Sequence, residues 1–142
     1  MENPSDVRVA SVLRSANRIA MVGLSSNPER PSYNVARYLM EHGYEVIPVN
    51  PNENEVLGAL AFARLRDVPG HIDIVNVFRR NTALVGHAKD AIAAGAGTLW
   101  MQLGVASDEA AKLAIDAGLT VVQDRCIFVE HSRLVLHGAR SA

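Results

Sequence analysis

The stretch IAMVGLSSNPERPSYNV, residues 19–35, predicts the fold more clearly than any other part of the chain. A short apolar run reaches Gly23, a polar loop follows, and an amphipathic helix begins near Ser32. This order is typical of the first strand, loop and helix of a nucleotide-binding α/β domain. We therefore expect a buried strand over residues 18–24 and a helix that Ser32 caps and Gly43 closes.

The rest of the chain repeats this alternation. Apolar runs predict four further strands, over residues 44–51, 71–79, 97–104 and 120–123. Helical patterns are expected in a leading segment, 1–17, that begins at Ser5, in 81–95, and in 107–119, which begins at Ser107. Between these elements, residues 52–70 indicate a covering connection with little regular structure, and residues 124–142 indicate an irregular or helical tail packed on the domain.

Strands that alternate with helices predict an α/β fold, a doubly wound Rossmann-like parallel sheet of about five strands with helices on both faces. The 142 residues are 49% hydrophobic and 20% charged, which is typical of one globular domain spanning 1–142. In such sheets ligands bind beyond the carboxyl ends of the strands. The segments that follow the strands are therefore the expected site.

Composition excludes several classes of partner. A net charge of −1 argues against nucleic acid, and no apolar run approaches the roughly 18 residues of a membrane span. The first residues, MENPSDVRVA, lack the basic start and apolar centre of a secretory signal peptide. Cys126 is the one cysteine, which excludes an internal disulfide. We expect a soluble, cytoplasmic protein.

The loop after the first strand suits an anion. It offers Gly23 for close backbone approach, the hydroxyl groups of Ser25 and Ser26, Arg30, and the start of a helix. Two further arginines, Arg79 and Arg125, follow the third and fifth strands, and guanidinium groups bind phosphate oxygens well. The alternative for each is structural: a plain turn for the loop, and a surface ion pair for each arginine.

The loop lacks the residues that binding sites for the common nucleotides require. A site for NAD requires G-x-G-x-x-G and an acid after the second strand. Here Gly23 is followed by Leu24 and Ser25, and the second strand ends at Asn50 and Pro51. No G-x-x-x-x-G-K-[ST] occurs anywhere in the chain, which excludes a P-loop. An NAD(P)-binding regulatory domain therefore stays only as a weaker alternative.

Five motifs follow one another at the predicted strand ends: VGLSSNPERPS, GYEVIPVNP, DIVNVFR, LWMQLG and VQDRC. In this order they resemble the stand-alone CoA-binding domain family, which is similar in fold to the CoA-binding N-terminal domain of the succinyl-CoA synthetase α subunit. The likeness runs from about Arg18 to Arg133. It implies a Rossmann-like fold, with coenzyme A (CoA) as the cofactor.

The resemblance also implies which residues hold CoA. Gly23 and Ser25 would lie against its nucleotide half, and Arg30 and Ser32 would hold phosphate. Where the family commonly has alanine, this chain has Leu24, whose larger side chain would narrow the space beside the phosphates. The complete expected set is Gly23, Leu24, Ser25, Ser26, Arg30, Ser32, Val49, Asn50, Pro51, Phe78, Arg79, Gln102, Gly104 and Arg125.

The function expected from these residues is binding of CoA or acyl-CoA, without a reaction of the protein's own. The alternative is a small enzyme that acts on CoA thioesters or CoA disulfides through Cys126, whose thiol the adjacent Arg125 could activate. No cluster of histidines, cysteines or acids has metal-ligand spacing, so we expect no metal. An exposed cleft would leave room for a homodimer or another protein partner.

Overall fold

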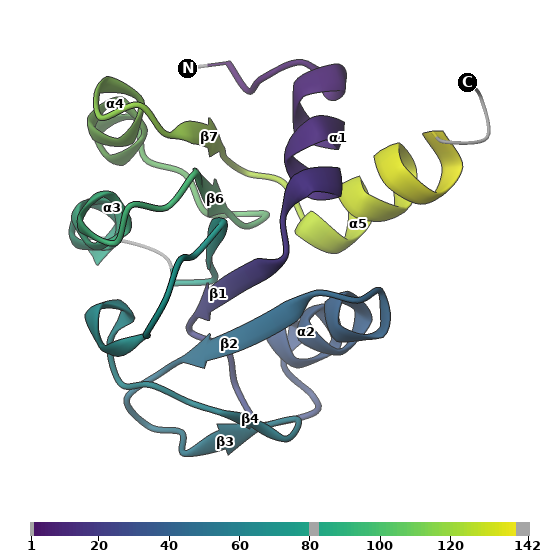
Figure 1. Ribbon diagram of the computed structural model, residues 1–142, viewed down its shortest axis with the longest axis vertical. Coiled ribbons are helices and arrows are strands. Elements are labelled where there is room, and N and C mark those ends of the chain that lie inside the picture. The colour runs from purple at the N-terminus through teal and green to yellow at the C-terminus, as the bar shows by residue number, and fades with distance from the viewer. Residues whose placement is uncertain (1, 80–82, 139–142) are drawn as a thin grey trace.

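The computed structural model describes residues 2–79 and 83–138 and has three layers, with a parallel sheet in the middle (Figure 1). The sheet has the strand order β2-β1-β5-β6-β7, and all its neighbouring pairs are parallel. This confirms the predicted doubly wound α/β fold. The strands are β1 (Arg18–Val22), β2 (Glu45–Val49), β5 (Ile74–Val77), β6 (Thr98–Met101) and β7 (Thr120–Val122).

The strands are shorter than the apolar runs predict. The run over residues 18–24 ends as a strand at Val22, because Gly23 adopts a positive φ of 89° and turns the chain out of the sheet. Similarly, β5 ends at Val77 and leaves Phe78 and Arg79 beyond the sheet edge. These apolar and polar residues beyond the strand ends are therefore available to line a ligand site.

Helices cover both faces of the sheet (Figure 1). On one face lie α3 (Leu84–Ala93), α4 (Asp108–Asp116) and the short 3₁₀-helix η1 (Leu65–Asp67). On the other lie α1 (Asp6–Ser15), α2 (Pro31–Glu41) and α5 (Ile127–His131). The helices of the first face pack through small side chains, and five alanines there are fully buried: Ala88, Ala91, Ala110, Ala111 and Ala114.

Two of the three predicted helix caps are confirmed. Ser5 Oγ accepts a hydrogen bond from the backbone N–H of Arg8, and Ser107 Oγ accepts one from Ala110. The prediction for Ser32 is wrong, because α2 begins at Pro31 and Arg30 is the N-cap residue. Proline is well suited to the first helical position, since its fixed φ is already helical. Ser32 is left free to bond elsewhere.

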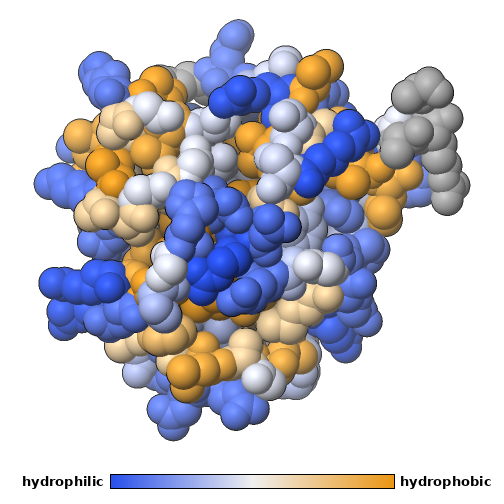
Figure 2. Space-filling view, in the orientation of Figure 1, coloured by the Kyte–Doolittle hydropathy of each residue, from blue (hydrophilic) through white to orange (hydrophobic). Residues whose placement is uncertain are grey.

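The connection over residues 52–70 has more structure than predicted. It contains an antiparallel pair, β3 (Glu55–Val56) and β4 (Ala59–Leu60), followed by η1. The turn between the strands has positive φ at both Leu57 and Gly58, the pattern of a type I′ hairpin. Leu60 is 68% exposed, and Figure 2 shows hydrophobic residues at the lower edge of this face, where the pair lies in Figure 1.

The C-terminal segment is helical and packed on the domain. α5 continues into a π-helical turn, η3 (Ser132–His137). The guanidinium of Arg133 bonds the carboxylate of Asp6 in α1 at 2.9 Å and that of Glu130 at 2.6 Å. These contacts fix the segment against the N-terminal helix.

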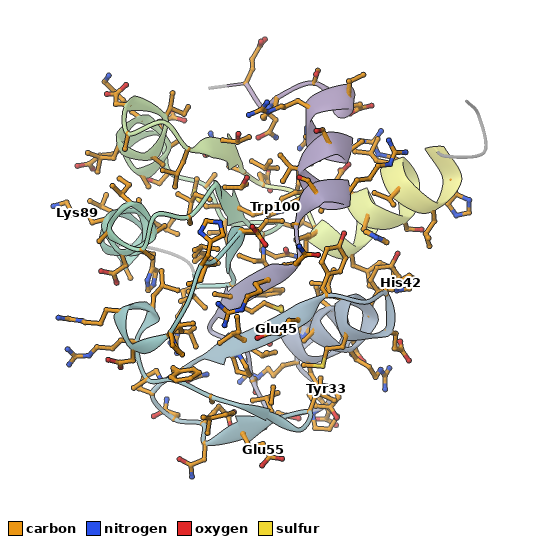
Figure 3. The ribbon with its side chains drawn as sticks, in the orientation of Figure 1. Tyr33, His42, Glu45, Glu55, Lys89 and Trp100 are labelled. Atoms are coloured by element: carbon orange, nitrogen blue, oxygen red, sulfur yellow. The ribbon has the colours of Figure 1, made fainter. Side chains whose placement is uncertain are left out.

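An aromatic cluster anchors α5 to α2. The ring of Phe128 stacks on that of Tyr38 with centroids 3.9 Å apart, and Tyr38 Oη lies 2.8 Å from His131 Nδ1. The ring of His42, at the far end of α2 from Tyr33 (Figure 3), lies 5.2 Å from that of His131. Among residues 2–79 and 83–138, no helix is long and apolar enough to cross a membrane.

Acid should weaken this cluster. Burial, with His42 nearby, lowers the pKa of His131 from its ordinary value of 6.5, so below that pH the unfolded chain takes up more protons than the folded one. The free energy of unfolding is therefore expected to fall as the pH drops from 7 to 5. Urea denaturation at several pH values should show a shallower fall for His131→Gln. Equal slopes for the two proteins would contradict this account.

Candidate functional site

A cleft of about 690 Å³ opens at the carboxyl ends of β1, β2, β5 and β6. This is the edge at which doubly wound sheets bind ligands. Four segments of the chain supply its walls, each directly after a strand, together with the start of α2 and the residue before α5. Its lining residues are Gly23, Ser25, Arg30, Pro31, Ser32, Val35, Asn50, Phe78, Arg79, Gln102, Leu103, Val105 and Cys126.

Gly23 brings the backbone of the first loop close to Arg79. Its N–H donates to the carbonyl of Val49 at 2.8 Å, which joins the ends of β1 and β2. A Cβ at this position would lie 3.0 Å from Cγ of Arg79, and the φ of 89° is one that other residues rarely adopt. The close approach of the Arg79 side chain therefore depends on a glycine here.

Serine hydroxyls shape the rest of the first loop. Ser32 Oγ accepts from the N–H of Ser25 at 3.1 Å, and Ser25 Oγ accepts from the N–H of Asn27 at 3.0 Å. The N–H of Ser26 donates to the carboxylate of Glu53 at 2.7 Å, so a residue of the β2–β3 connection closes over the loop. The loop is thus fixed in a curled form before any ligand binds.

Asn50 is the buried polar group where the strand ends meet. It is 7% exposed, and its Nδ2 donates to the carbonyl of Leu24 at 3.1 Å. Its Oδ1 accepts from the N–H of Asn52 at 3.0 Å and, at 3.5 Å, from the guanidinium of Arg79. An aspartate in this place would be suited to a ribose hydroxyl of NAD, whereas an amide carries no charge that would repel phosphate.

Two arginines give the cleft its positive charge. Both Arg30 and Arg79 are exposed and line the cleft from different loops. Arg125, the third predicted cation, lines a separate hollow beside Asp124. Its Nε lies 3.8 Å from Oε1 of Glu130, so it takes part in the ion-pair network of the C-terminal segment.

The cleft also has apolar lining residues, which we call its far wall: Phe78, Leu103 and Val105. Cys126, which directly precedes α5, lines the cleft as well. Gln102 is 6% exposed, and its Oε1 accepts from Asn76 Nδ2 and from the N–H of Ile127, each at 3.3 Å. The side chain of Gln102 therefore holds the strand end and the start of α5 together.

Eight of the fourteen residues that the sequence predicts line the cleft, and the other six do not. Leu24 is fully buried in the core beneath α2, so its size does not narrow the cleft. Gly104 is also outside the cleft lining, and its N–H donates a hydrogen bond to Asp124 Oδ1 at 2.8 Å. The remaining four are Ser26, Val49, Pro51 and Arg125.

Several lining residues were outside the predicted set. Pro31 and Val35 lie on the first turns of α2 and face the cleft, and Val105 follows the fourth strand end. The apolar pattern of α2 identified Val35 only as a core residue. The signal that would have placed it at the cleft is its position three residues after Ser32, which puts the two side chains on the same face of α2.

Another hollow, of about 340 Å³ and distinct from the one that Arg125 lines, shares Arg79 with the cleft, and we call it the second hollow. Its walls come from the ends of β1 and β2, from the chain before η1 and from α3. Val49 and Pro51, which are absent from the first cleft, line this one, and Arg79 lines both. The two hollows therefore meet at one guanidinium side chain.

Comparison with known proteins identifies the family. The profile of the CoA binding domain family matches residues 17–132, most of the chain. The chain belongs to this family. The match agrees with the resemblance that the five strand-end motifs indicate.

The chain is also similar to individual proteins, among them the following three. The uncharacterized protein YneT of Bacillus subtilis is 42% identical over 132 residues, covering 93% of this chain and 98% of YneT. A hypothetical protein from Pyrococcus horikoshii has 38% identity and a TM-score of 0.89 over 95% of this chain and 99% of its own. The alpha subunit of an ADP-forming acetate–CoA ligase from Pyrococcus furiosus is 39% identical over 57 residues, 39% of this chain and 12% of the subunit.

Replacing Gly23 by alanine should destabilise the protein by about 1–2 kcal/mol, because it adds strain at a positive φ and a Cβ against Arg79. Urea denaturation measures the loss. Gly43→Ala is the matched control, because Gly43 has a φ of 92° but nothing within 4 Å of the added Cβ. A loss at Gly23 no larger than that at Gly43 would contradict the close contact with Arg79.

Proposed function

We propose that this member of the CoA binding domain family binds CoA or acyl-CoA in the cleft at its strand ends. The observation that carries the proposal is the combination, in one cleft, of a curled glycine–serine loop, two arginines and a largely apolar far wall. CoA has the matching construction, since a charged pyrophosphate joins its nucleotide to a long, mostly apolar pantetheine arm. Ligand sites of this size are commonly apolar with a few well-placed polar groups.

Support for phosphate binding comes from Arg30 and the start of α2. The side chain of Arg30, the N-cap residue, makes no capping hydrogen bond to the helix, so the guanidinium can reach a ligand. The positive end of the helix dipole lies at the same point, next to Ser25 and Ser32. A phosphate here would gain a charge-assisted bond and a favourable field.

Support for the pantetheine arm comes from the far wall. Phe78 and Leu103 offer apolar surface, and the side chain of Leu103 is 64% exposed, so it is accessible to a ligand in the cleft. An arm that runs from the first loop along this wall ends near Cys126. The acyl group or thiol of the ligand would therefore lie at the entrance to α5.

A second candidate function follows from the place of Cys126. Because its side chain lines the cleft and is partly exposed, a CoA disulfide could bind beside it. The Cys126 thiolate would attack one sulfur of that disulfide, forming a mixed disulfide and releasing the other half as a thiolate. A small-molecule thiol from solution would then attack the mixed disulfide, form a new disulfide with the bound half and release the Cys126 thiolate. With such a thiol as co-substrate, the protein would be an enzyme of thiol–disulfide exchange in addition to a CoA-binding module.

Titration calorimetry with CoA tests the main proposal. We expect saturable binding of CoA and none of NAD, and a loss of about tenfold or more in CoA affinity for Arg30→Ala, since a bond to a charged group contributes roughly 1.5–3 kcal/mol. Arg37→Ala is the matched control, because Arg37 is an exposed arginine of the same helix that does not line the cleft. Binding of NAD without CoA would overturn the proposal.

Cys126→Ser separates the two functions. As a binding module, the protein should keep its CoA affinity in this variant, since serine is nearly the same size. As a disulfide-exchanging enzyme, it should lose all turnover of CoA disulfide, measured by release of free thiol. Release at the same rate from both proteins would eliminate the role of Cys126.

A further inference from the structure

The side-chain amide of Gln102 has a nitrogen that the fold does not use. Gln102 is 6% exposed and lines the cleft, and its Oε1 accepts hydrogen bonds from Asn76 Nδ2 and from the N–H of Ile127. Its Nε2 donates to no atom in the part of the chain that the structure describes. The buried side-chain atoms without a partner in that part are Asn76 Oδ1 and His87 Nε2. Gln102 Nε2 is therefore accessible from the cleft.

Two backbone groups determine this orientation of the amide. The N–H of Ile127 can only donate, so the oxygen of Gln102 must face it, at 3.3 Å. The carbonyl of Trp100 can only accept, and it lies 3.4 Å from Asn76 Nδ2. The nitrogen of Asn76 thus faces two acceptors, the Trp100 carbonyl and Gln102 Oε1. The nitrogen of Gln102 is left on the side of the cleft.

The same orientation leaves a polar atom unpaired in the core. Asn76 is fully buried in β5, and its Oδ1 has no hydrogen-bond partner among residues 2–79 and 83–138. A buried acceptor without a donor is unfavourable and rare in folded proteins. Local departures of this kind are expected near functional sites. The unpaired oxygen therefore supports a function for the donor that Gln102 presents to the cleft.

The position and charge of this donor indicate what it can bind. Gln102 bonds the residue that directly follows Cys126, so its amide lies at the end of the cleft where the pantetheine arm of the proposed ligand ends. The donor is neutral, and Phe78 and Leu103 add apolar surface to the same cleft. A neutral N–H among apolar groups suits a neutral carbonyl oxygen, whereas the guanidinium groups of the cleft suit phosphate.

On these grounds we propose that the cleft selects acyl-CoA over free CoA, with Gln102 Nε2 donating a hydrogen bond to the thioester carbonyl oxygen. Free CoA ends in a thiol and has no oxygen at that point. The two amide carbonyls of the pantetheine arm lie farther from the sulfur and are common to both compounds. The proposal rests on the binding of CoA compounds in the cleft, and it names the class of compound that the site prefers.

Titration calorimetry with three ligands tests the proposal on the full chain. The ligands are CoA, acetyl-CoA and S-ethyl-CoA, a thioether that has a methylene group in place of the thioester carbonyl. We expect acetyl-CoA to bind about fivefold tighter than S-ethyl-CoA, as is typical of one hydrogen bond between neutral groups. Acetyl-CoA should also bind tighter than CoA. Equal affinities for acetyl-CoA and S-ethyl-CoA would overturn the proposal, and this comparison requires no variant.

Gln102→Met assigns the hydrogen bond to Gln102, because methionine has a similar length and no donor. It should reduce the ratio of the affinities for acetyl-CoA and S-ethyl-CoA from about five to about one. Both affinities are measured on the same protein, so a general disturbance of the cleft cancels from the ratio. A ratio that persists in Gln102→Met would overturn the role of Gln102, as would an equal loss for all three ligands, which indicates contact with an amide of the arm.

Gln123→Met is the matched control. Gln123 is a buried glutamine directly after β7 whose Oε1 also accepts from a backbone N–H, that of Ser107, at 3.2 Å. It does not line the cleft, so this variant should keep the ratio of about five. Loss of the ratio in Gln123→Met would overturn the assignment to Gln102. If none of the three ligands binds the parent protein, the proposed function itself fails, and the two failures are distinguishable.

Discussion

The side-chain amide of Asn50 holds three strand ends in one arrangement, and the geometry of the cleft depends on it. Its nitrogen bonds the carbonyl of Leu24 after β1, and its oxygen lies within reach of Arg79 after β5. A buried amide left without partners costs free energy, so the surrounding loops gain stability only in the arrangement that satisfies it. The loops that form the first cleft are therefore positioned by the folded protein before a ligand arrives.

Much of this fold follows from the sequence, and the reasons are local. Apolar runs of four or five residues separated by helical patterns indicate a parallel sheet, because strands buried on both faces carry no alternation. The predicted strands were too long where an apolar run continues past the edge of the sheet. Gly23 and Phe78 were predicted to belong to strands, but both lie just beyond the strand ends. The β3–β4 pair was missed because its turn places Leu57, a residue without turn preference, at a positive φ.

The cleft was less predictable than the fold. Gly23, Arg30 and Arg79 were expected from loop chemistry, and they do line the same cleft. Arg125 was expected for the same reason, but its side chain lies near Glu130, a contact that no spacing in the sequence reveals. Whether a cation at a strand end points into the site depends on what the neighbouring helix offers it, and that is a property of the tertiary structure.

The position of Trp100 has an optical consequence. It is the chain's one tryptophan, it is fully buried beside α1 (Figure 3), and its indole N–H donates to the carbonyl of Arg125 at 2.9 Å. That carbonyl directly precedes Cys126 at the wall of the cleft. The emission of a single fluorophore therefore reports, without any label, on the polypeptide segment that closes the far end of the cleft. A separation of this segment from β6 would expose the indole to water and shift its emission to longer wavelength.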